Sequence, residues 1–236
     1  MTILAIDTSG LSASVAVIRE NKLLGEFFID LKMTHSQTIM PMLDKLLVAL
    51  ELTCDDIDLI AASSGPGSFT GLRIGAAAAQ GLAFALNKDI VPVPTLDALA
   101  YNVINASGLV VPIMDAKRGQ VYSAVYSYNN NKFSRITDYL AEDLNEIFKT
   151  LHSVKKDSNV TRNESIVFTG DGVDAYKESI LAKGFLVAPP HASRQRAATV
   201  AALAVQLASQ GKTVNPDGFV PLYIRKPQAE QALEAK

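Results

Sequence analysis

The chain has 236 residues, of which 48% are hydrophobic and 19% charged, so it is neither fibrous nor disordered and can bury a sizeable core. This length predicts one large domain or two smaller lobes. Its 22 Lys and Arg residues are balanced by 24 Asp and Glu residues, which gives a formal net charge of −2. Because the chain has no overall field for polyanions, we do not expect the isolated chain to bind nucleic acid tightly.

Cysteine content and hydropathy indicate the compartment. The single cysteine, Cys54, excludes an intrachain disulfide and a multi-cysteine metal cluster, as is typical of a reducing environment. The N-terminal sequence MTILAIDTSG lacks a basic region and a long apolar run, and no later segment reaches about 18 uninterrupted apolar residues. We therefore expect a cytoplasmic protein that is not exported and does not span a membrane.

The first part of the chain predicts a three-stranded antiparallel meander followed by helices and parallel strands. Short β-rich runs alternate with turn sequences, and Ile39, Leu43 and Leu46 then recur at helical spacing after a Thr/Ser start that can cap the helix. The predicted strands are 2–7, 12–19, 23–30, 59–63 and 90–93, and the predicted helices are 36–50, 70–86 and one beginning near 95. This order predicts a mixed α/β sheet.

The second part partly repeats this order. The predicted strands are 109–115, 120–127, 132–138 and 166–170, with helices at 141–151, after 174 and at 196–209, and a mobile polar loop at 153–163. We therefore predict a first lobe at 1–105, a smaller second lobe at 106–190 that is a trimmed copy of the first, and a C-terminal segment at 191–236 whose helix packs back on the body.

A carboxylate and two hydroxyls, on Asp7, Thr8 and Ser9, lie where the first strand turns into the second. In nucleotide-handling folds this position faces phosphate and metal. The simpler interpretation is that these side chains accept hydrogen bonds from the turn's own backbone. Both interpretations stay open at this stage.

The segment SSGPGSFTGLRIG, residues 63–75, joins a strand to a helix. Glycines at 65, 67 and 71 permit a tight backbone there, and the helix N-terminus behind them offers free N–H groups to an anion. Together with Ser68 and the fixed charge of Arg73, this loop is a candidate phosphate site. The spacing matches neither the dinucleotide fingerprint nor the P-loop, so a glycine-rich connector that lets the helix pack closely is an equal alternative.

The helix after this loop is apolar on almost all sides, with small residues at 71, 75, 79 and 83. Such a helix must be covered on more than one side, either by the core or by another chain. Methionines on the 36–50 helix outside its leucine stripe favour a two-helix partner surface. The predicted interface residues are Met40, Leu43, Leu47, Leu72, Gly75, Ala76, Ala79 and Leu82.

Metal and nucleophile motifs find no support. His35 is followed four residues later by Ile39, so the two-histidine helix face that holds a metal is missing, and no G-x-S-x-G nucleophile frame occurs. In the second part, MDAKRGQVY mirrors the Asp7 turn. Arg118 is there either at a charged hairpin tip or in contact with a ligand or partner across an interlobe cleft.

The motifs ILAIDTS, SSGPGSFTGLRIG, DAKRGQVY and PLYIRKP, in this order over essentially the whole chain, resemble the bacterial TsaB (YeaZ) family. Proteins of that family are accessory subunits in the synthesis of threonylcarbamoyladenosine in tRNA. The resemblance implies a two-lobed fold of the actin, sugar-kinase and acetate-kinase superfamily with RNase H-like βββαβα lobes. It also implies that the first two helices form the partner surface.

By this resemblance, the chain pairs with a catalytic paralogue, TsaD, and an ATPase, TsaE, which transfer a threonylcarbamoyl group to adenosine 37 of tRNAs reading ANN codons. The chain itself is then non-catalytic, without a metal or cofactor of its own, and ATP is bound at the level of the complex. It forms homodimers in isolation and contacts tRNA only through the complex. The alternatives are a nucleotide-hydrolysing kinase-like enzyme and a metallopeptidase of the same superfamily.

Overall fold

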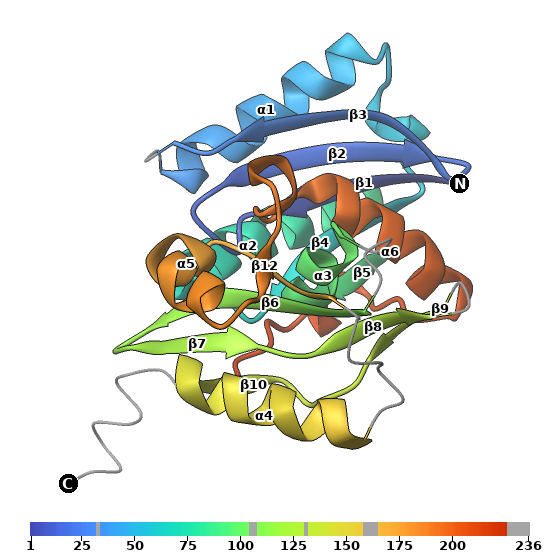
Figure 1. The fold of residues 1–236 in the computed structure, drawn as a ribbon. Helices are drawn as coiled ribbons and strands as arrows, with labels where there is room; N and C mark the ends of the chain where they lie inside the picture. The colour runs from blue at the N-terminus through green and yellow to red at the C-terminus, as the bar shows by residue number, and fades with distance from the viewer. Residues whose placement is uncertain (32–33, 104–107, 130–131, 158–164, 226–236) are drawn as a thin grey trace, which may run out of the picture.

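Two β-sheets organise the chain, and helices cover their faces (Figure 1). The computed structural model describes residues 1–31, 34–103, 108–129, 132–157 and 165–225. The first sheet and its helices comprise β1 (Thr2–Asp7), β2 (Ala13–Arg19), β3 (Lys22–Ile29), α1 (His35–Ala49), β4 (Leu59–Gly65), α2 (Phe69–Leu86) and β5 (Ile90–Pro94). The second part comprises α3 (Thr95–Tyr101), β6 (Gly108–Lys117), β7 (Gln120–Ser123), β8 (Tyr126–Asn129), β9 (Lys132–Arg135), β10 (Leu140–Asp143), α4 (Leu144–Asp157), β11 (Ser165–Thr169), α5 (Val173–Ala182), β12 (Leu186–Val187) and α6 (Ala197–Ser209).

The first sheet has the strand order β3-β2-β1-β4-β5. Its first three strands are antiparallel, and β1, β4 and β5 are parallel, so the predicted meander and the parallel continuation are confirmed. Along β1, alternate residues point to opposite faces: Leu4 and Ile6 join the core under α1 and α2, whereas Ile3 and Ala5 join the core under α6. The first lobe is therefore a sheet between two helical layers.

The second sheet repeats this topology, with the order β10-β7-β6-β11-β12. Strand β6 is antiparallel to β7 and parallel to β11, as β1 is antiparallel to β2 and parallel to β4. The hairpin β8–β9 is an addition to this plan. The expected α/β class with two similar lobes is confirmed, while the exact lobe boundaries stay a prediction.

Three boundaries differ from the predicted ones. The strand expected at 120–127 is interrupted at the buried Ala124 and Val125, and its two parts, β7 and β8, pair with different ends of β6. At the interruption, Val125 N donates to Thr137 Oγ1 and Val125 O accepts from Ile136 N. The helix expected from residue 141 begins at Leu144, since 140–143 pair with β7 as β10 and Asp143 Oδ1 accepts the amides of Asn145 and Glu146. Helix α4 continues to Asp157, into the expected 153–163 loop, whose remainder lies outside the described residues.

Helices α3 and α6 join the lobes. Leu96, Leu99 and Ala100 of α3 pack into the second lobe's core, although α3 follows the last strand of the first sheet. Helix α6 follows the last strand of the second sheet and returns to the first, where Ala197, Val200 and others fill the core. Each lobe thus supplies a helix that contacts the other lobe, and the predicted return of the C-terminal helix to the body is confirmed.

Two helices depart in detail from expectation. Thr34 is the N-cap of α1, but its side chain makes no capping hydrogen bond, so the expected Thr/Ser cap is wrong. Among the described residues, α2 is the helix long and apolar enough to cross a membrane by length and composition. Its packing on the first sheet accounts for the apolar character of its inner face, where Gly75, Ala76 and Ala79 are buried.

Candidate functional site

The turn that follows β1 is buried and holds its own carboxylate. Asp7 Oδ1 accepts hydrogen bonds from Ser9 N at 2.9 Å and from Ser9 Oγ at 2.6 Å. Burial raises the pKa of Asp7, and the hydroxyls of Ser63 and Ser9 partly oppose that rise. One carboxylate oxygen, Oδ1, thus serves its own turn, as the simpler interpretation of this motif predicted, whereas Asp7 Oδ2 is buried without a hydrogen bond of normal geometry.

The glycine-rich loop closes directly on this turn. Ser68 N donates to Ser9 O at 2.7 Å, and Thr8 Oγ1 donates to Gly71 O at 2.8 Å. A Cβ on Gly67 would overlap Ser9 O, and one on Gly71 would overlap Thr8 O. These two glycines are therefore needed for close approach of two backbones.

Two amides in the first turn of α2 are also satisfied within the protein. Ser68 Oγ accepts from Gly71 N at 3.2 Å, and Ser68 O accepts from Leu72 N at 2.8 Å. Gly65 has a φ of 113°, and the carbonyl of Leu222 lies where its Cβ would be. The structure supports the connector interpretation of the loop, and phosphate binding there stays a prediction.

Arg73, expected beside the phosphate, contacts other groups. Its side chain is exposed, with the guanidinium carbon 3.9 Å from the centroid of the Phe69 ring. Its Nε donates to the Tyr223 hydroxyl at 3.4 Å. Arg73 therefore stacks on an aromatic ring at the surface, and its contact with a phosphate stays a prediction.

Buried polar groups from distant parts of the chain meet at Gly10, which follows the Asp7 turn. His35 Nε2 donates to Gly10 O at 3.0 Å, and the buried amide of Gln195 lies against Gly10 on another side. In the second lobe, burial raises the pKa of Asp171 to about 6, although Gln195 and Arg194 oppose the rise. Sequence reasoning missed Asp171 and Gln195 as members of this junction, because neither belongs to a motif that points to the first lobe.

Arg194 bridges the two lobes. Its Nε donates to Asp30 Oδ2, which follows β3, and its Nη2 donates to Asp174 Oδ2 on α5, both at 2.7 Å. Burial tends to lower the pKa of Arg194, but its hydrogen bonds to Asp30 and Asp174 raise it overall. One guanidinium thus holds a carboxylate from each lobe.

Most of the predicted interface residues are core residues of the monomer. The small residues at spacing four pack inward: a Cβ on Gly75 would overlap Thr8 Oγ1, and Ala79 is fully buried. A residue buried within its own chain offers little surface to a partner, so this burial argues against direct contact, and the interface role of these residues stays a prediction: Leu43, Leu47, Leu72, Gly75, Ala76 and Ala79. Met40 is exposed and Leu82 is half-buried, so these two remain available.

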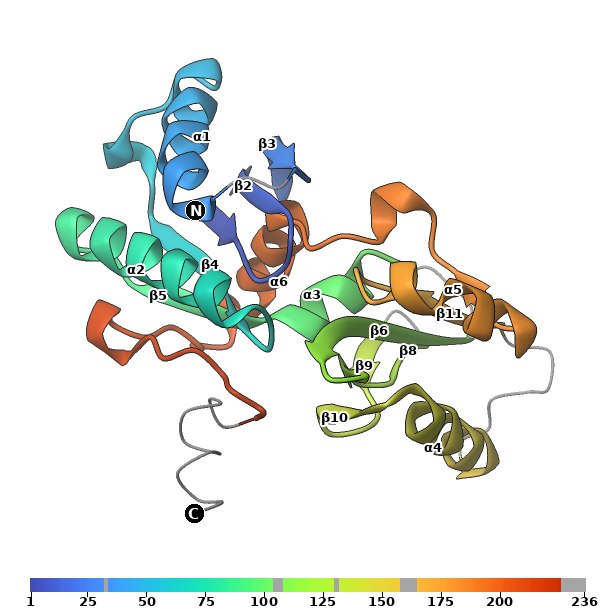
Figure 2. The same cartoon turned by 90° about the vertical axis from the view of Figure 1, so that its left-hand side faces the viewer.

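A different face of α2 is exposed and apolar, and on α1 the exposed Met40 and Val48 flank the exposed Asp44. Phe84 is 77% exposed and Val48 is 70% exposed, and nothing lies within 4 Å of a Cβ built on Gly81. Both helices cover the same side of the first sheet (Figure 2). We call this surface the α1–α2 outer stripe; it consists of Met40, Val48, Ala77, Gly81, Phe84 and Ala85.

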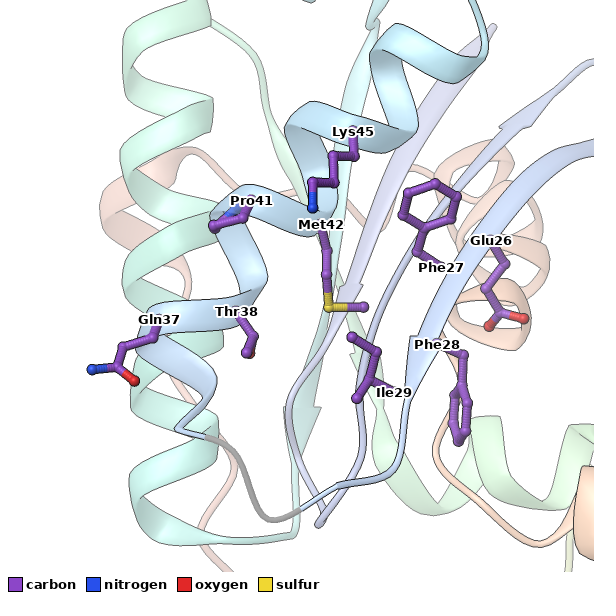
Figure 3. Close-up of a pocket in the computed structure, with 9 residues that line it drawn as sticks. All are labelled: Glu26, Phe27, Phe28, Ile29, Gln37, Thr38, Pro41, Met42 and Lys45. Atoms are coloured by element: carbon purple, nitrogen blue, oxygen red, sulfur yellow. The ribbon is translucent and has the colours of Figure 1, made fainter.

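A groove of about 490 Å³ lies between β3 and α1. Figure 3 shows Phe27, Ile29 and Met42 pointing toward one another in it, with Phe28 and Glu26 on the other side of the strand. No predicted site residue lines this groove. It lies at the free edge of the first sheet, where β3 has a neighbour on one side.

The β6–β7 turn is an exposed charged hairpin tip. Lys117 Nζ lies 2.7 Å from Asp115 Oδ2, and Lys117 and Arg118 have positive φ angles of 64° and 57°. Burial tends to raise the pKa of Asp115, but hydrogen bonds from Lys117 and its charge lower it overall. The hairpin-tip interpretation of this motif is confirmed, and a ligand or partner contact of Arg118 stays open.

Comparisons with known proteins agree on one family. The family model described as TsaD, tRNA N6-adenosine threonylcarbamoyltransferase, matches residues 30–233. The TsaB protein of Bacillus subtilis, described as a tRNA threonylcarbamoyladenosine biosynthesis protein, is 34% identical, with 98% of this chain and 96% of that protein aligned.

Solved structures confirm the architecture. YeaZ from Pseudomonas aeruginosa has a TM-score of 0.75 and 25% identity, covering 94% of this chain and 99% of that one. An activator of 2-hydroxyisocaproyl-CoA dehydratase from Clostridium difficile, solved with bound ADPNP, has a TM-score of 0.51 at 14% identity, covers 90% of this chain and 97% of that one, and shares the fold. The fold is that of the actin-like ATPases. With the relatives matched over nearly their whole length, the chain belongs to the TsaB (YeaZ) family of tRNA threonylcarbamoyladenosine biosynthesis proteins.

Proposed function

We propose that the chain is a non-catalytic, cytoplasmic subunit of the assembly that adds a threonylcarbamoyl group to adenosine 37 of tRNAs reading ANN codons. In this proposal it pairs with a TsaD-type catalytic subunit and a TsaE-type ATPase, and any ATP is bound at the level of the complex. Family membership supports the pathway. The buried Asp7, hydrogen-bonded to its own turn, and the glycine loop closed on that turn support a subunit that does not itself perform the transfer.

The α1–α2 outer stripe is the observation that carries the pairing proposal. It presents exposed apolar side chains and, at Ala77, Gly81 and Ala85, small residues at the spacing of a helical turn. A partner helix can approach such a surface closely, and burying Phe84 removes a large exposed apolar group from water. A second copy of the chain would use the same stripe, so homodimer and heterodimer compete.

Two matched substitutions on α2 test this proposal. Ala77→Arg introduces a charge into the exposed stripe, so the melting temperature should stay near the wild-type value while affinity for a TsaD-type subunit falls about 100-fold or more. Ala79→Arg places the same charge in the core and should unfold the monomer. The measurements are thermal melting and calorimetric titration with the TsaD-type subunit. Normal pairing by a folded Ala77→Arg chain would show that the stripe is not the interface.

The alternatives of a nucleotide-hydrolysing enzyme and a metallopeptidase have less support. Both need a carboxylate or loop that faces a substrate, whereas Asp7 Oδ1 accepts from Ser9 in its own turn and the glycine loop is hydrogen-bonded to Thr8 and Ser9. Assays of ATP turnover and casein cleavage by the isolated, metal-treated chain separate them from the scaffold proposal.

A further inference from the structure

Two aromatic rings and Arg73 gather where α2 begins and the chain's C-terminal segment passes. The Phe69 and Tyr223 rings have centroids 5.6 Å apart, and Arg73 stacks on Phe69 and hydrogen-bonds Tyr223. The rings are 41% and 37% exposed. Arg225 lies two residues after Tyr223 in the sequence. We call Phe69, Arg73, Arg118, Tyr223 and Arg225 the aromatic–cationic patch.

The C-terminal segment makes this patch continuous across both lobes. Leu222 N donates to Ser64 O at 2.6 Å in the first lobe, and Arg225 Nη1 donates to Ala116 O at 3.1 Å in the second. Ala116 is two residues before the exposed Arg118 at the hairpin tip. In Figure 2 the red C-terminal segment runs past α2 toward the second sheet. The patch thus joins the start of α2 to the β6–β7 hairpin.

The patch is positively charged although the whole chain is not. The three segments that form it, 64–86, 116–122 and 219–225, contain Arg73, Lys117, Arg118 and Arg225 and no acidic residue. The adjacent Asp115 is already paired with Lys117 at 2.7 Å. A surface with cations beside exposed aromatic rings can bind a nucleic-acid strand, because arginines bind phosphates and aromatic faces stack with bases.

We propose that the aromatic–cationic patch binds an RNA strand, with the arginines on phosphates and an unpaired base stacked on Tyr223 or Phe69. This inference rests on the proposed function, because the substrate there is a tRNA. It adds a direct RNA contact to a subunit that the sequence predicted to meet tRNA only through the complex. The net charge of −2 keeps the contact weak in the isolated chain.

The test measures fluorescence anisotropy of a labelled RNA hairpin with a single-stranded loop, and of a blunt RNA duplex of equal length, with the full chain over a range of salt concentrations. Replacing both Arg73 and Arg225 by Gln should reduce the slope of log affinity against log salt by roughly 1.4, at about 0.7 per phosphate contact. Tyr223→Leu should weaken hairpin binding about tenfold and leave the slope unchanged. Lys177→Gln, a matched loss of an exposed cation on α5, should change neither quantity.

Thermal melting of each variant ensures that only folded chains are compared. An unchanged salt slope in the double variant, an unchanged affinity in Tyr223→Leu, or an equal loss in Lys177→Gln overturns the inference. Submicromolar binding of the hairpin at physiological salt that survives the arginine substitutions overturns it too. Normal RNA binding by the patch variants with lost pairing to a TsaD-type subunit assigns the patch to a protein partner instead. If Ala77→Arg pairs normally while the patch variants lose RNA, the pairing proposal fails and the RNA site stands.

Discussion

The two lobes place equivalent turns in opposite environments. The turns after β1 and β6 occupy the same position in matching sheets. Asp7 is the last residue of β1 and Asp115 lies two residues before the end of β6, and the Oδ1 atom of each accepts the amide two residues later. Burial raises the pKa of Asp7, whereas Lys117 outweighs the partial burial of Asp115 and lowers its pKa. The first turn is packed inside the protein and the second is an exposed hairpin tip. An equivalent position in the sheet therefore does not determine whether an aspartate is buried or faces solvent.

Contacts outside each turn explain the difference. The glycine loop, His35 and Gln195 all pack against the first turn. In the second turn, nothing lies within 4 Å of a Cβ built on Gly119. The first turn is therefore tightly packed and the second is open to solvent, and the following predictions test this contrast.

The largest effect is expected in α2, from the same substitution at two glycines. Gly71→Ala pushes a methyl group into Thr8 O and should lower the free energy of unfolding by about 3 kcal/mol or more. Gly81→Ala enters open space in a helix and should raise it by about 0.5 to 1 kcal/mol. Urea unfolding of both variants is the measurement. Equal effects at the two positions would show that the loop is not closed on the turn.

The next largest effect on stability is expected at Asp171, which lies between Gly170 and Gly172 after β11. Its folded pKa of about 6 lies above the unfolded value of about 3.9, so the ionised carboxyl reduces stability increasingly as pH rises from about 4 to about 6. Asp171→Asn should therefore be more stable than wild type near pH 7.5, by up to about 3 kcal/mol for two pKa units, and nearly equal to it near pH 4. Urea unfolding at a series of pH values measures this, and a difference that does not vary with pH would contradict it.

A smaller effect is expected from the bridge between the lobes. Arg194→Gln removes both ion pairs and should reduce the free energy of unfolding by about 1 to 2 kcal/mol, because the guanidinium is largely buried. Arg194→Lys keeps the charge but loses the forked geometry, and should recover only part of that. If Arg194→Gln unfolds at the wild-type urea concentration, the lobes are held together by α3 and α6 alone.

The smallest effect is expected at the hairpin tip. Lys117→Gln removes an exposed ion pair with Asp115 and should change the free energy of unfolding by no more than about 0.5 kcal/mol. It should also move the pKa of Asp115 back up, since Lys117 holds it down. Carboxyl titration by NMR reads the pKa directly, and an unmoved pKa would mean that Lys117 is not its partner in solution.

Local patterns predicted the sheets but not the long-range contacts. Short β-rich runs bounded by turn residues located β1 to β5. The same patterns joined β7 and β8 into one strand, because the interruption at Val125 involves hydrogen bonds with Ile136 and Thr137, which a local pattern does not show. Helix α4 was misplaced because β10 is recognised only through its partner β7.

The same limit applies to the candidate site. Composition identified α2 as a helix with two covered sides, but the spacing of its small residues could not say which side faces its own chain. Gly75 and Ala79 pack inward because Thr8 and the sheet are there, and the stripe through Ala77 and Gly81 is exposed. Gln195 carries no local signal, so its contact with Gly10 is visible only in the fold.

The central claim, that this chain supports transfer without performing it, is tested most directly by reconstitution. The assay follows threonylcarbamoyl transfer to tRNA by TsaD-type and TsaE-type subunits with wild-type chain, with the Asp7→Asn chain, and without the chain. We predict no efficient transfer without the chain and wild-type rates with Asp7→Asn, because Asp7 is buried in its own turn. Loss of transfer by a folded Asp7→Asn chain that still pairs with the TsaD-type subunit would contradict the account.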